Sequence, residues 1–358
     1  MSPIRLVLLA VLLVATPAAA APEEARLLRF PHVQGDKLAF VHAGDVWTVP
    51  LAGGEARRLT SFDDGIALFP RISPDGTTVA YSGERSGTRQ VYVVPYAGGV
   101  PRRLTFYPDV GRLPPRGGYD NLVYDWTPDG EKLLVRSNRT PYGERIGKYF
   151  LVDPNGGLPT PLPIPEGGPA TFSPDGKKIA YCIISREWRT WKRYRAGRAQ
   201  DVWIYDLETD SVERLTTFEG TDNQPLWIGE TIYFTSDRTG TLNLYACDLA
   251  TRDIRAVTTY DDFDVLFPSR GAGGLVFERA GWIWFMDAET EAIRKVQITF
   301  ADDRPWLRPR WIEGDGHLDD WAVSPSGKRA IVTVRGDVFT VPAEKGEPHR
   351  ITRTPARR

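Results

Sequence analysis

The sequence predicts an all-β protein built from a repeated four-stranded sheet, the arrangement of a β-propeller blade. The first observation is a tetrad, mostly rich in arginine, that returns seven times along the 358 residues, once in a degraded form. Three pairs of successive closing threonines, Thr60 and Thr105, Thr216 and Thr258, and Thr258 and Thr299, lie 45, 42 and 41 residues apart, which is within the range of one blade. The copies are Arg57–Thr60, Arg102–Thr105, the degraded Thr160–Pro163, Glu213–Thr216, Arg255–Thr258, Val296–Thr299 and His349–Thr352.

The second observation is a recurrent Pro-Asp-Gly turn that is followed by a short, wholly apolar run. Proline fixes φ and glycine permits a positive φ, so this tripeptide predicts a tight turn between two strands. A run such as Val79–Tyr81 is typical of a sheet covered on both faces, and stacked blades supply that covering. The turn occurs at Pro74–Gly76, Pro128–Gly130 and Pro174–Gly176, and in the varied form Pro325–Gly327.

The second repeat shows the expected elements in order. Pro70–Ser73 is the first strand, Val79–Tyr81 the second, Gln90–Val94 the third and Arg102–Thr105 the fourth. A polar loop at Ser82–Arg89 joins the second and third strands. We predict no amphipathic helix in the chain.

The number of repeats leaves two architectures open. Seven repeats begin near residues 29, 68, 122, 168, 222, 265 and 317. They could close a seven-bladed ring, or form a six-bladed propeller followed by the first blade of a second one. Thr299 and Thr352 are 53 residues apart, and the irregular stretch Trp306–Gly316 lies between them. This gap favours a six-bladed propeller at residues 21–312 and a further blade at 313–358.

Composition bounds the class of partner. The chain has 41% hydrophobic residues, a formal net charge of −1 and only two Met beside 11 Trp and 29 Pro. These values are typical of a soluble protein with a large core, and they give no reason to expect nucleic acid or an anionic membrane as a partner.

The N-terminus has the pattern of a signal peptide. Arg5 is followed by the apolar run Leu6–Ala15, then by Pro17 and the small residues Ala18–Ala20. We therefore expect residues 1–20 to be cleaved and the mature protein to be periplasmic or secreted, without stable membrane insertion. A retained membrane anchor is the alternative, although the apolar run is short for a span.

Several stretches resemble the tricorn peptidase family, whose propeller repeats are also similar to those of the periplasmic protein TolB. The resemblance covers essentially the whole mature chain, and it rests on the order in which these sequence segments occur. The segments are Asp222–Trp227, Phe234–Arg238, Asp261–Val265, Ser324–Ala330 and Arg335–Phe339.

The resemblance implies a larger protein. Tricorn peptidases carry a six-bladed propeller, a seven-bladed propeller, a helical region, a PDZ module and serine-peptidase domains. Their propellers are thought to admit peptides and guide them to the active site. By this pattern the chain holds the first propeller and one blade of the second, so we expect it to be a fragment or a natural truncation. The family prototype is cytoplasmic, which differs from the location expected here.

The residues themselves give no catalytic constellation, metal site or cofactor motif. A nucleophile needs a base within hydrogen-bond reach, and no G-x-S-x-G elbow is present. The four histidines are scattered through the first and last repeats, and Cys182 and Cys247 show no metal-ligand spacing. We expect these cysteines to be buried free thiols, with a disulfide as the alternative. The histidines are His32, His42, His317 and His349.

Charged loops suggest a substrate-binding face. Linkers that enter the next blade are acidic, and the loops between second and third strands carry arginine in six of seven repeats. As substrate-binding candidates we take Asp222, Asp264, Arg186 and Arg238, with carboxylates meeting a peptide ammonium and arginines a carboxylate. The linker acids are Asp63, Asp64, Asp109, Asp222, Asp261, Asp262, Asp264, Asp302 and Asp303, and the loop arginines are Arg85, Arg139, Arg186, Arg238, Arg279 and Arg335.

The alternative is that these charges pair with one another and cap turns, where an exposed pair contributes about 0–1 kcal/mol. If they bind substrate instead, charge reversal at Asp222 and Asp264 should change peptide binding without lowering the melting temperature.

The fourth repeat carries an inserted loop, Ser185–Arg198, in which arginine alternates with aromatic residues. A structural hairpin held by cation–π stacking is one interpretation. Contact with another domain or subunit, through Trp188, Trp191, Arg193 and Tyr194, is a second. Nucleic-acid binding is a third, and the neutral chain does not favour it.

These observations lead to one functional expectation and one rival. The chain is expected to be the non-catalytic N-terminal propeller of an exported tricorn-like serine peptidase that selects oligopeptides and channels them to absent catalytic domains. Its expected partners are oligopeptides and its own missing domains or other subunits, with a homo-oligomer only in a full-length form. The rival is a stand-alone, TolB-like propeller that binds a partner protein in the periplasm.

Overall fold

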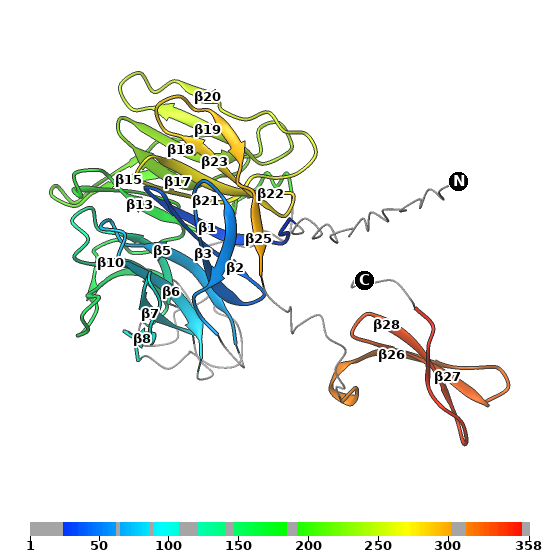
Figure 1. The fold of residues 1–358 in the computed structure, drawn as a ribbon. Helices are drawn as coiled ribbons and strands as arrows, with labels where there is room; N and C mark the ends of the chain where they lie inside the picture. Colours follow the sequence, from blue (N-terminus) through cyan, green and yellow to red (C-terminus); the bar gives the residue numbers. More distant parts are fainter. Residues whose placement is uncertain are drawn as a thin grey trace, which may run out of the picture. The chain divides into compact units, whose positions relative to one another are not determined.

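The computed structural model describes residues 24–61, 65–85, 89–106, 121–139, 147–184, 192–301 and 313–352. The expected signal peptide and three candidate residues, Arg186, Trp188 and Trp191, lie outside these ranges. Within them the chain is all-β, and a 3-10 turn, η3 (Asp315–His317), is the one helical element (Figure 1). The predicted fold class is therefore confirmed.

The chain divides into two compact units, Met1–Asp302 and Asp303–Arg358. The first unit holds six antiparallel sheets, each of which has four consecutive strands in chain order. The sheets are β1 (Arg29–Gln34), β2 (Lys37–His42), β3 (Asp45–Pro50), β4 (Gly54–Arg58); β5 (Ala67–Ile72), β6 (Thr78–Glu84), β7 (Arg89–Pro95), β8 (Arg102–Arg103); β9 (Leu122–Trp126), β10 (Leu133–Ser137), β11 (Lys148–Val152), β12 (Thr160–Pro161); β13 (Ala170–Phe172), β14 (Lys178–Tyr181), β15 (Trp203–Asp206), β16 (Ser211–Arg214); β17 (Asp222–Ile228), β18 (Thr231–Ser236), β19 (Asn243–Asp248), β20 (Ile254–Ala256); and β21 (Leu266–Gly271), β22 (Gly274–Arg279), β23 (Trp282–Asp287), β24 (Ile293–Lys295).

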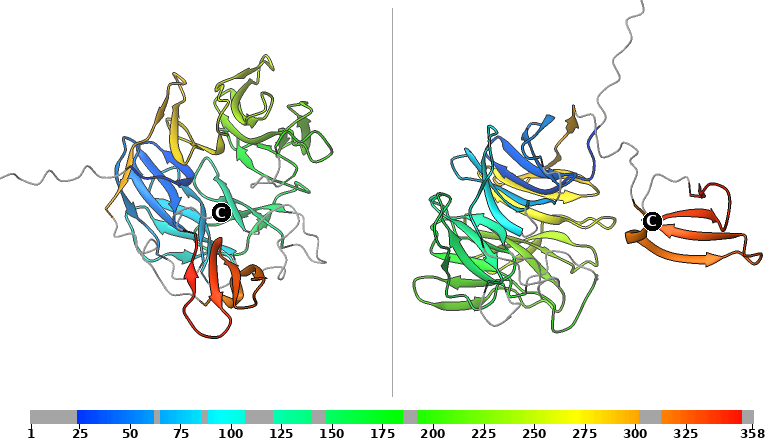
Figure 2. Two further views of the ribbon diagram at one scale, coloured as in Figure 1. Left: turned by 90° about the vertical axis from the view of Figure 1, so that its right-hand side faces the viewer. Right: turned by 90° about the horizontal axis from the view of Figure 1, so that it is seen from below.

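The six sheets form a ring. Their first strands contact one another in the order β1, β5, β9, β13, β17 and β21, and β21 contacts β1 again. Figure 2 shows the sheets following one another around this ring in sequence order. The first strand of each sheet is thus innermost, and its residues line the propeller axis.

The second unit holds one sheet, made of β26 (Leu318–Val323), β27 (Arg329–Val334), β28 (Asp337–Pro342) and β29 (His349–Arg350). The six-plus-one arrangement, rather than a closed ring of seven, is thus what the structure shows. Trp321 and Val323 of this sheet are 64% and 58% exposed, so the blade has apolar surface that no described residue covers.

An extra strand completes the first sheet. Strand β25 (Ile298–Phe300) follows the sixth sheet and pairs in parallel with β4, at the outer edge of the first. Glu24, just before the first sheet, bridges to Thr299 on the other side of β25. The two ends of the ring are therefore joined by backbone hydrogen bonds as well as by side-chain packing.

This strand corrects one predicted element. We predicted that Val296–Thr299 ends the fourth strand of the sixth sheet, but that strand is β24. The Val296 amide donates to the Ile283 carbonyl just as the Leu59 amide donates to that of Val46. The tetrad of the sixth sheet is therefore Arg294–Gln297, two residues earlier than predicted. Residues Ile298–Phe300 have a strand pattern because they form a separate strand that pairs with β4.

The Pro-Asp-Gly turns form as predicted, for a reason that lies in their side chains. The Asp75 carboxylate accepts hydrogen bonds from the Ser73 hydroxyl and the Thr77 amide, and Gly76 has φ +71°. The Ser73 hydrogen bond is the main cause of a lowered pKa of the Asp75 carboxyl. Asp129 and Asp175 make the equivalent contacts in the next two sheets.

Candidate functional site at the propeller axis

Four of the six innermost strands have the same backbone kink. Each of these strands places a non-glycine residue at positive φ directly before a proline, and its register with the second strand shifts at this point. A positive φ is strained for a bulky side chain and costs about 1–3 kcal/mol, so the surrounding ring must hold it. The residues are Phe30 (φ 50°), Phe69 (φ 51°), Gln224 (φ 54°) and Phe267 (φ 45°).

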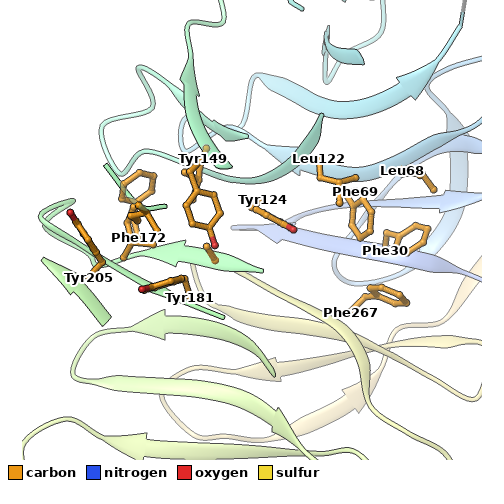
Figure 3. Packing of buried hydrophobic residues seen from close by; sticks show 14 of the residues in the cluster. Phe30, Leu68, Phe69, Leu122, Tyr124, Tyr149, Phe172, Tyr181, Tyr205 and Phe267 are labelled. Atoms are coloured by element: carbon orange, nitrogen blue, oxygen red, sulfur yellow. The ribbon is translucent and has the colours of Figure 1, made fainter. Parts of the chain in front are cut away.

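The three kinked phenylalanines meet at the axis. The ring of Phe30 lies 4.5 Å from that of Phe69 and 4.7 Å from that of Phe267, measured between centroids (Figure 3). The cavity left on the axis beside them has a volume of about 40 Å³. That space holds only about two or three water molecules, so a peptide chain does not fit along the axis in this conformation.

A polar layer lies next to the phenylalanines. Arg270 donates from Nη2 to Asp125 Oδ2 at 2.8 Å and from Nε to Thr171 Oγ1 at 2.7 Å. Arg71 donates from Nε to the Tyr124 carbonyl at 2.6 Å and from Nη1 to the Pro70 carbonyl at 2.9 Å. His32, 3% exposed, accepts from the Ile72 amide through Nδ1.

The charges of this layer do not cancel. Burial, together with the guanidinium groups of Arg71 and Arg270, holds the pKa of His32 well below its usual value, so the imidazole is neutral. Burial also lowers the pKa of Arg71 to about 10, which leaves it charged at neutral pH. Two guanidinium groups against the single carboxylate of Asp125 leave one surplus positive charge.

A wider cavity of about 280 Å³ adjoins the polar layer. His32, Asp125 and Arg270 line both this cavity and the small axial one, so the two meet at these residues. Trp126 and Trp227 supply much of the apolar wall, and residues of all six sheets contribute. We call this wider cavity the mouth of the axis.

The predicted substrate residues lie elsewhere. Asp222, at the start of β17, is fully buried and ion-paired to Arg238 at 2.7 Å. Burial raises the pKa of its carboxyl to about 6, against the opposing effect of Arg238. The expectation that charge reversal at Asp222 leaves the melting temperature unchanged is therefore revised, because the change would place an unpaired charge in the core.

Asp264 and Arg238 are also engaged in contacts within the chain. Asp264 accepts from the Leu242 amide at 3.0 Å and pairs with Lys192 at 3.0 Å. The Arg238 guanidinium lies 4.9 Å from the centre of the Phe218 ring. At the sixth blade, Arg279 pairs with the linker acid Asp262. A loop arginine therefore pairs with a linker acid at two blades, as the alternative interpretation held.

The inserted loop is described from Lys192 onward. Arg193 donates to the Gly240 carbonyl at 3.2 Å, and Arg195 pairs with the buried Asp237 at 3.1 Å. Arg195 also lies 5.0 Å from the Phe218 ring centre, a cation–π contact. Tyr194 is half-buried. This part of the loop therefore docks on the propeller, and its role toward another domain stays a prediction.

The cysteines and the residue types that bind metals form no disulfide and no metal site in the described ranges. Cys182 and Cys247 are buried free thiols, as predicted. No group of three or more His, Cys, Asp or Glu side chains in the part described could hold a metal ion. The same residues include no helix that is long and apolar enough to span a membrane.

Sequence reasoning missed the axial residues, although a signal was available. Phe-Pro or Gln-Pro occurs in four first strands, and Arg71 and Arg270 follow two of those prolines by one and two residues. A repeat-by-repeat comparison of the first strands would have found the pattern. It could not have shown that all of these side chains converge on one axis.

The ring of six four-stranded sheets defines the class of protein as a six-bladed β-propeller. Residues 25–292 match the family described as the tricorn protease N-terminal beta propeller domain. The chain belongs to this family.

Individual relatives agree with this assignment. Tricorn protease homolog 1 of Streptomyces coelicolor is 32% identical over 341 residues, which cover 93% of this chain and 30% of the relative. A putative tricorn-like protease N-terminal subunit of Sulfurisphaera tokodaii is 28% identical over 49% of this chain and 85% of its own length. The crystal structure of the tricorn protease superposes with a TM-score of 0.70 at 22% identity, over 92% of this chain and 32% of that one. The chain thus spans about a third of the length of its long relatives.

Proposed function

We propose that this chain is the non-catalytic propeller of an exported tricorn-like serine peptidase, and that it selects oligopeptides for catalytic domains carried elsewhere. Membership of the tricorn N-terminal propeller family supports the non-catalytic assignment. The Sulfurisphaera tokodaii relatives are named as separate N- and C-terminal subunits, so catalytic domains could be supplied by the rest of a longer chain or by a second one.

The observation that carries the selection proposal is the closed axis. Phe30, Phe69 and Phe267 leave about 40 Å³ beside them, which excludes a peptide unless these rings move apart. The propeller would therefore act as a gate, in which displacement of the phenylalanines limits what passes.

Export is proposed from the N-terminal pattern of Arg5, the run Leu6–Ala15 and Ala18–Ala20. Mass spectrometry of the extracytoplasmic fraction should find a mature N-terminus at Ala21. A protein that keeps residues 1–20 and stays in the cytoplasm would contradict this part of the proposal.

The gate is tested by opening it in protein that also carries its catalytic domains. Phe69→Ala removes one of the three axial rings and should raise the cleavage rate of long peptides more than that of tripeptides. Phe40→Ala is the matched control, since Phe40 is an equally buried phenylalanine within the first blade and away from the axis. Both variants create a core cavity and lose stability, but only the first should change the length preference.

Identical length preferences in the wild type, Phe69→Ala and Phe40→Ala would contradict selection at the axis. Cleavage by the catalytic domains at the same rate and with the same preference when this propeller is absent would contradict any selecting role.

A further inference from the structure

The axis holds a positive charge without a counter-ion. His32, Arg71, Asp125 and Arg270, contributed by four of the six sheets, are the histidine and charged side chains that line the small axial cavity. His32 is neutral, and Asp125 balances one of the two arginines. An enclosed charge without a partner is costly, so this arrangement favours the binding of an anion.

Both carboxylate oxygens of Asp125 accept hydrogen bonds from neighbouring groups. Its Oδ2 accepts from Arg270, from the Thr171 hydroxyl at 3.0 Å and from the Phe172 amide at 3.2 Å, and its Oδ1 accepts from the Trp126 amide at 2.9 Å. The carboxylate is thereby held against the third and fourth sheets. No ion pair joins it to Arg71 in the described part of the chain, so Arg71 carries the surplus charge.

Each arginine also keeps one nitrogen for a ligand. Arg71 uses Nε and Nη1 on the Tyr124 and Pro70 carbonyls, and Arg270 uses Nε and Nη2 on Thr171, Asp125 and the Phe172 carbonyl. Arg71 Nη2 and Arg270 Nη1 have no acceptor among the residues that the structure describes. Both side chains line the same cavity, and these bonds fix both guanidinium groups in place before a ligand arrives.

We propose that the propeller axis binds a small carboxylate anion between Arg71 and Arg270, with the apolar body of the ligand in the mouth beside Trp126 and Trp227. One surplus positive charge suits a monovalent carboxylate better than a dianion such as phosphate. The small axial cavity has room for a carboxylate group, while the 280 Å³ mouth has room for an aromatic ring. This proposal does not depend on the gate described above, since the ligand enters by the mouth and need not pass the phenylalanines.

The first experiment needs no variant. Calorimetric titration of the full chain with phenylacetate should show binding, while phenylacetamide, a neutral molecule of nearly the same shape, should bind at least about tenfold more weakly, because a charge-assisted hydrogen bond is lost. Added salt should weaken the phenylacetate complex. Equal binding of the two molecules, or no binding of phenylacetate, would overturn the proposal. Tighter binding of inorganic phosphate than of phenylacetate would overturn the choice of a carboxylate.

Variants then place the site. Arg71→Gln should weaken phenylacetate binding about tenfold or more. Arg57→Gln is the matched control, since the Arg57 guanidinium also donates to two backbone carbonyls, those of Tyr96 and Ala97, but on the outside of the propeller. Asp125→Asn removes the competing negative charge and should strengthen binding, a direction that mere loss of structure would not produce. Equal affinities for the wild type, Arg71→Gln and Arg57→Gln would show that the ligand binds elsewhere and would overturn the assignment.

Discussion

At the scale of single residues, the threonine that closes five of the seven repeats has a specific structural role. Thr60 Oγ1 accepts from the Val46 amide at 2.9 Å and donates to Asp45 Oδ1 at 3.0 Å, which ties the end of the fourth strand to the start of the third. The same arrangement recurs at four other blades, through Thr105 with Gln90, Thr216 with Asp201, Thr258 with Asn243 and Thr352 with Asp337. The tetrad is thus conspicuous in the sequence because its last residue makes this contact.

We expect Thr258→Val to lower the free energy of unfolding by about 1–3 kcal/mol, because the buried Leu244 amide loses its acceptor while the side-chain shape is kept. Chemical denaturation measures this change. Thr231→Val is the control, since the Thr231 hydroxyl makes no hydrogen bond to a described residue, and its effect should be within about 0.5 kcal/mol. Equal effects of the two substitutions would contradict the role assigned to Thr258.

A buried carboxylate should make stability depend on pH. Glu278 is 4% exposed, bonds to Arg29 and to the amide of the axial Phe30, and burial raises the pKa of its carboxyl to about 7. Because the folded pKa exceeds the unfolded value of 4.5, the folded state binds the proton more tightly. The stabilisation is complete below about pH 4.5 and is lost as the pH rises through about 7.

We therefore expect Glu278→Gln, which stays neutral, to gain stability relative to the wild type between pH 5 and pH 8, by an amount on the order of 2 kcal/mol. Denaturation at both pH values measures the difference. A stability difference that does not change with pH would show that the Glu278 carboxyl does not titrate in this range.

At the scale of elements, strand β25 connects the two ends of the ring. It lies between β4 and Glu24, and the Gln297 and Ile298 carbonyls accept from the Gly54 and Ala25 amides at 2.8 and 2.7 Å. The inner strands alone already contact one another around the ring, so β25 adds a backbone connection at the outer edge of the first sheet.

We expect Thr299→Pro to lower the melting temperature, with a loss of stability of about 3 kcal/mol, because proline cannot donate to a neighbouring strand and its ring restricts the backbone. Thr299→Ala keeps the amide and serves as the control, so it should cost much less. Calorimetric melting of both variants tests this. Similar melting temperatures for the two would mean that β25 contributes little to closure.

At the scale of the whole molecule, the chain comprises two units that we expect to differ in stability. The six-bladed unit buries apolar clusters between successive sheets, whereas the single sheet of the second unit leaves Leu318, Trp321, Val323, Ile331 and Ile351 exposed. A lone sheet without neighbours is marginal, because each face of a blade needs another blade to cover it.

Limited proteolysis should therefore cut near residues 305–318 and leave a resistant fragment that contains residues 24–301. Intact-mass spectrometry of the digestion products measures the site. Resistance that extends to residue 352 would show instead that the second unit is as stable as the first.

The repeat length, the tetrad and the Pro-Asp-Gly turn are local patterns, so they were enough to predict the all-β class and the strand order within each sheet. They only favoured six blades plus one over a closed ring of seven, because closure depends on contacts between distant strands. The two-residue error at Val296–Thr299 shows the limit, since Ile298–Phe300 has a strand pattern whose partner lies some 240 residues earlier in β4.

The axial site was decided only by the tertiary structure. His32, Arg71, Asp125 and Arg270 are far apart in the chain, and each alone is an ordinary polar residue of a first strand. They become one charged site because closure of the ring brings the innermost strands together around a single axis. Burial of Asp222 has the same origin, because a linker acid becomes a core residue only when two neighbouring sheets enclose it.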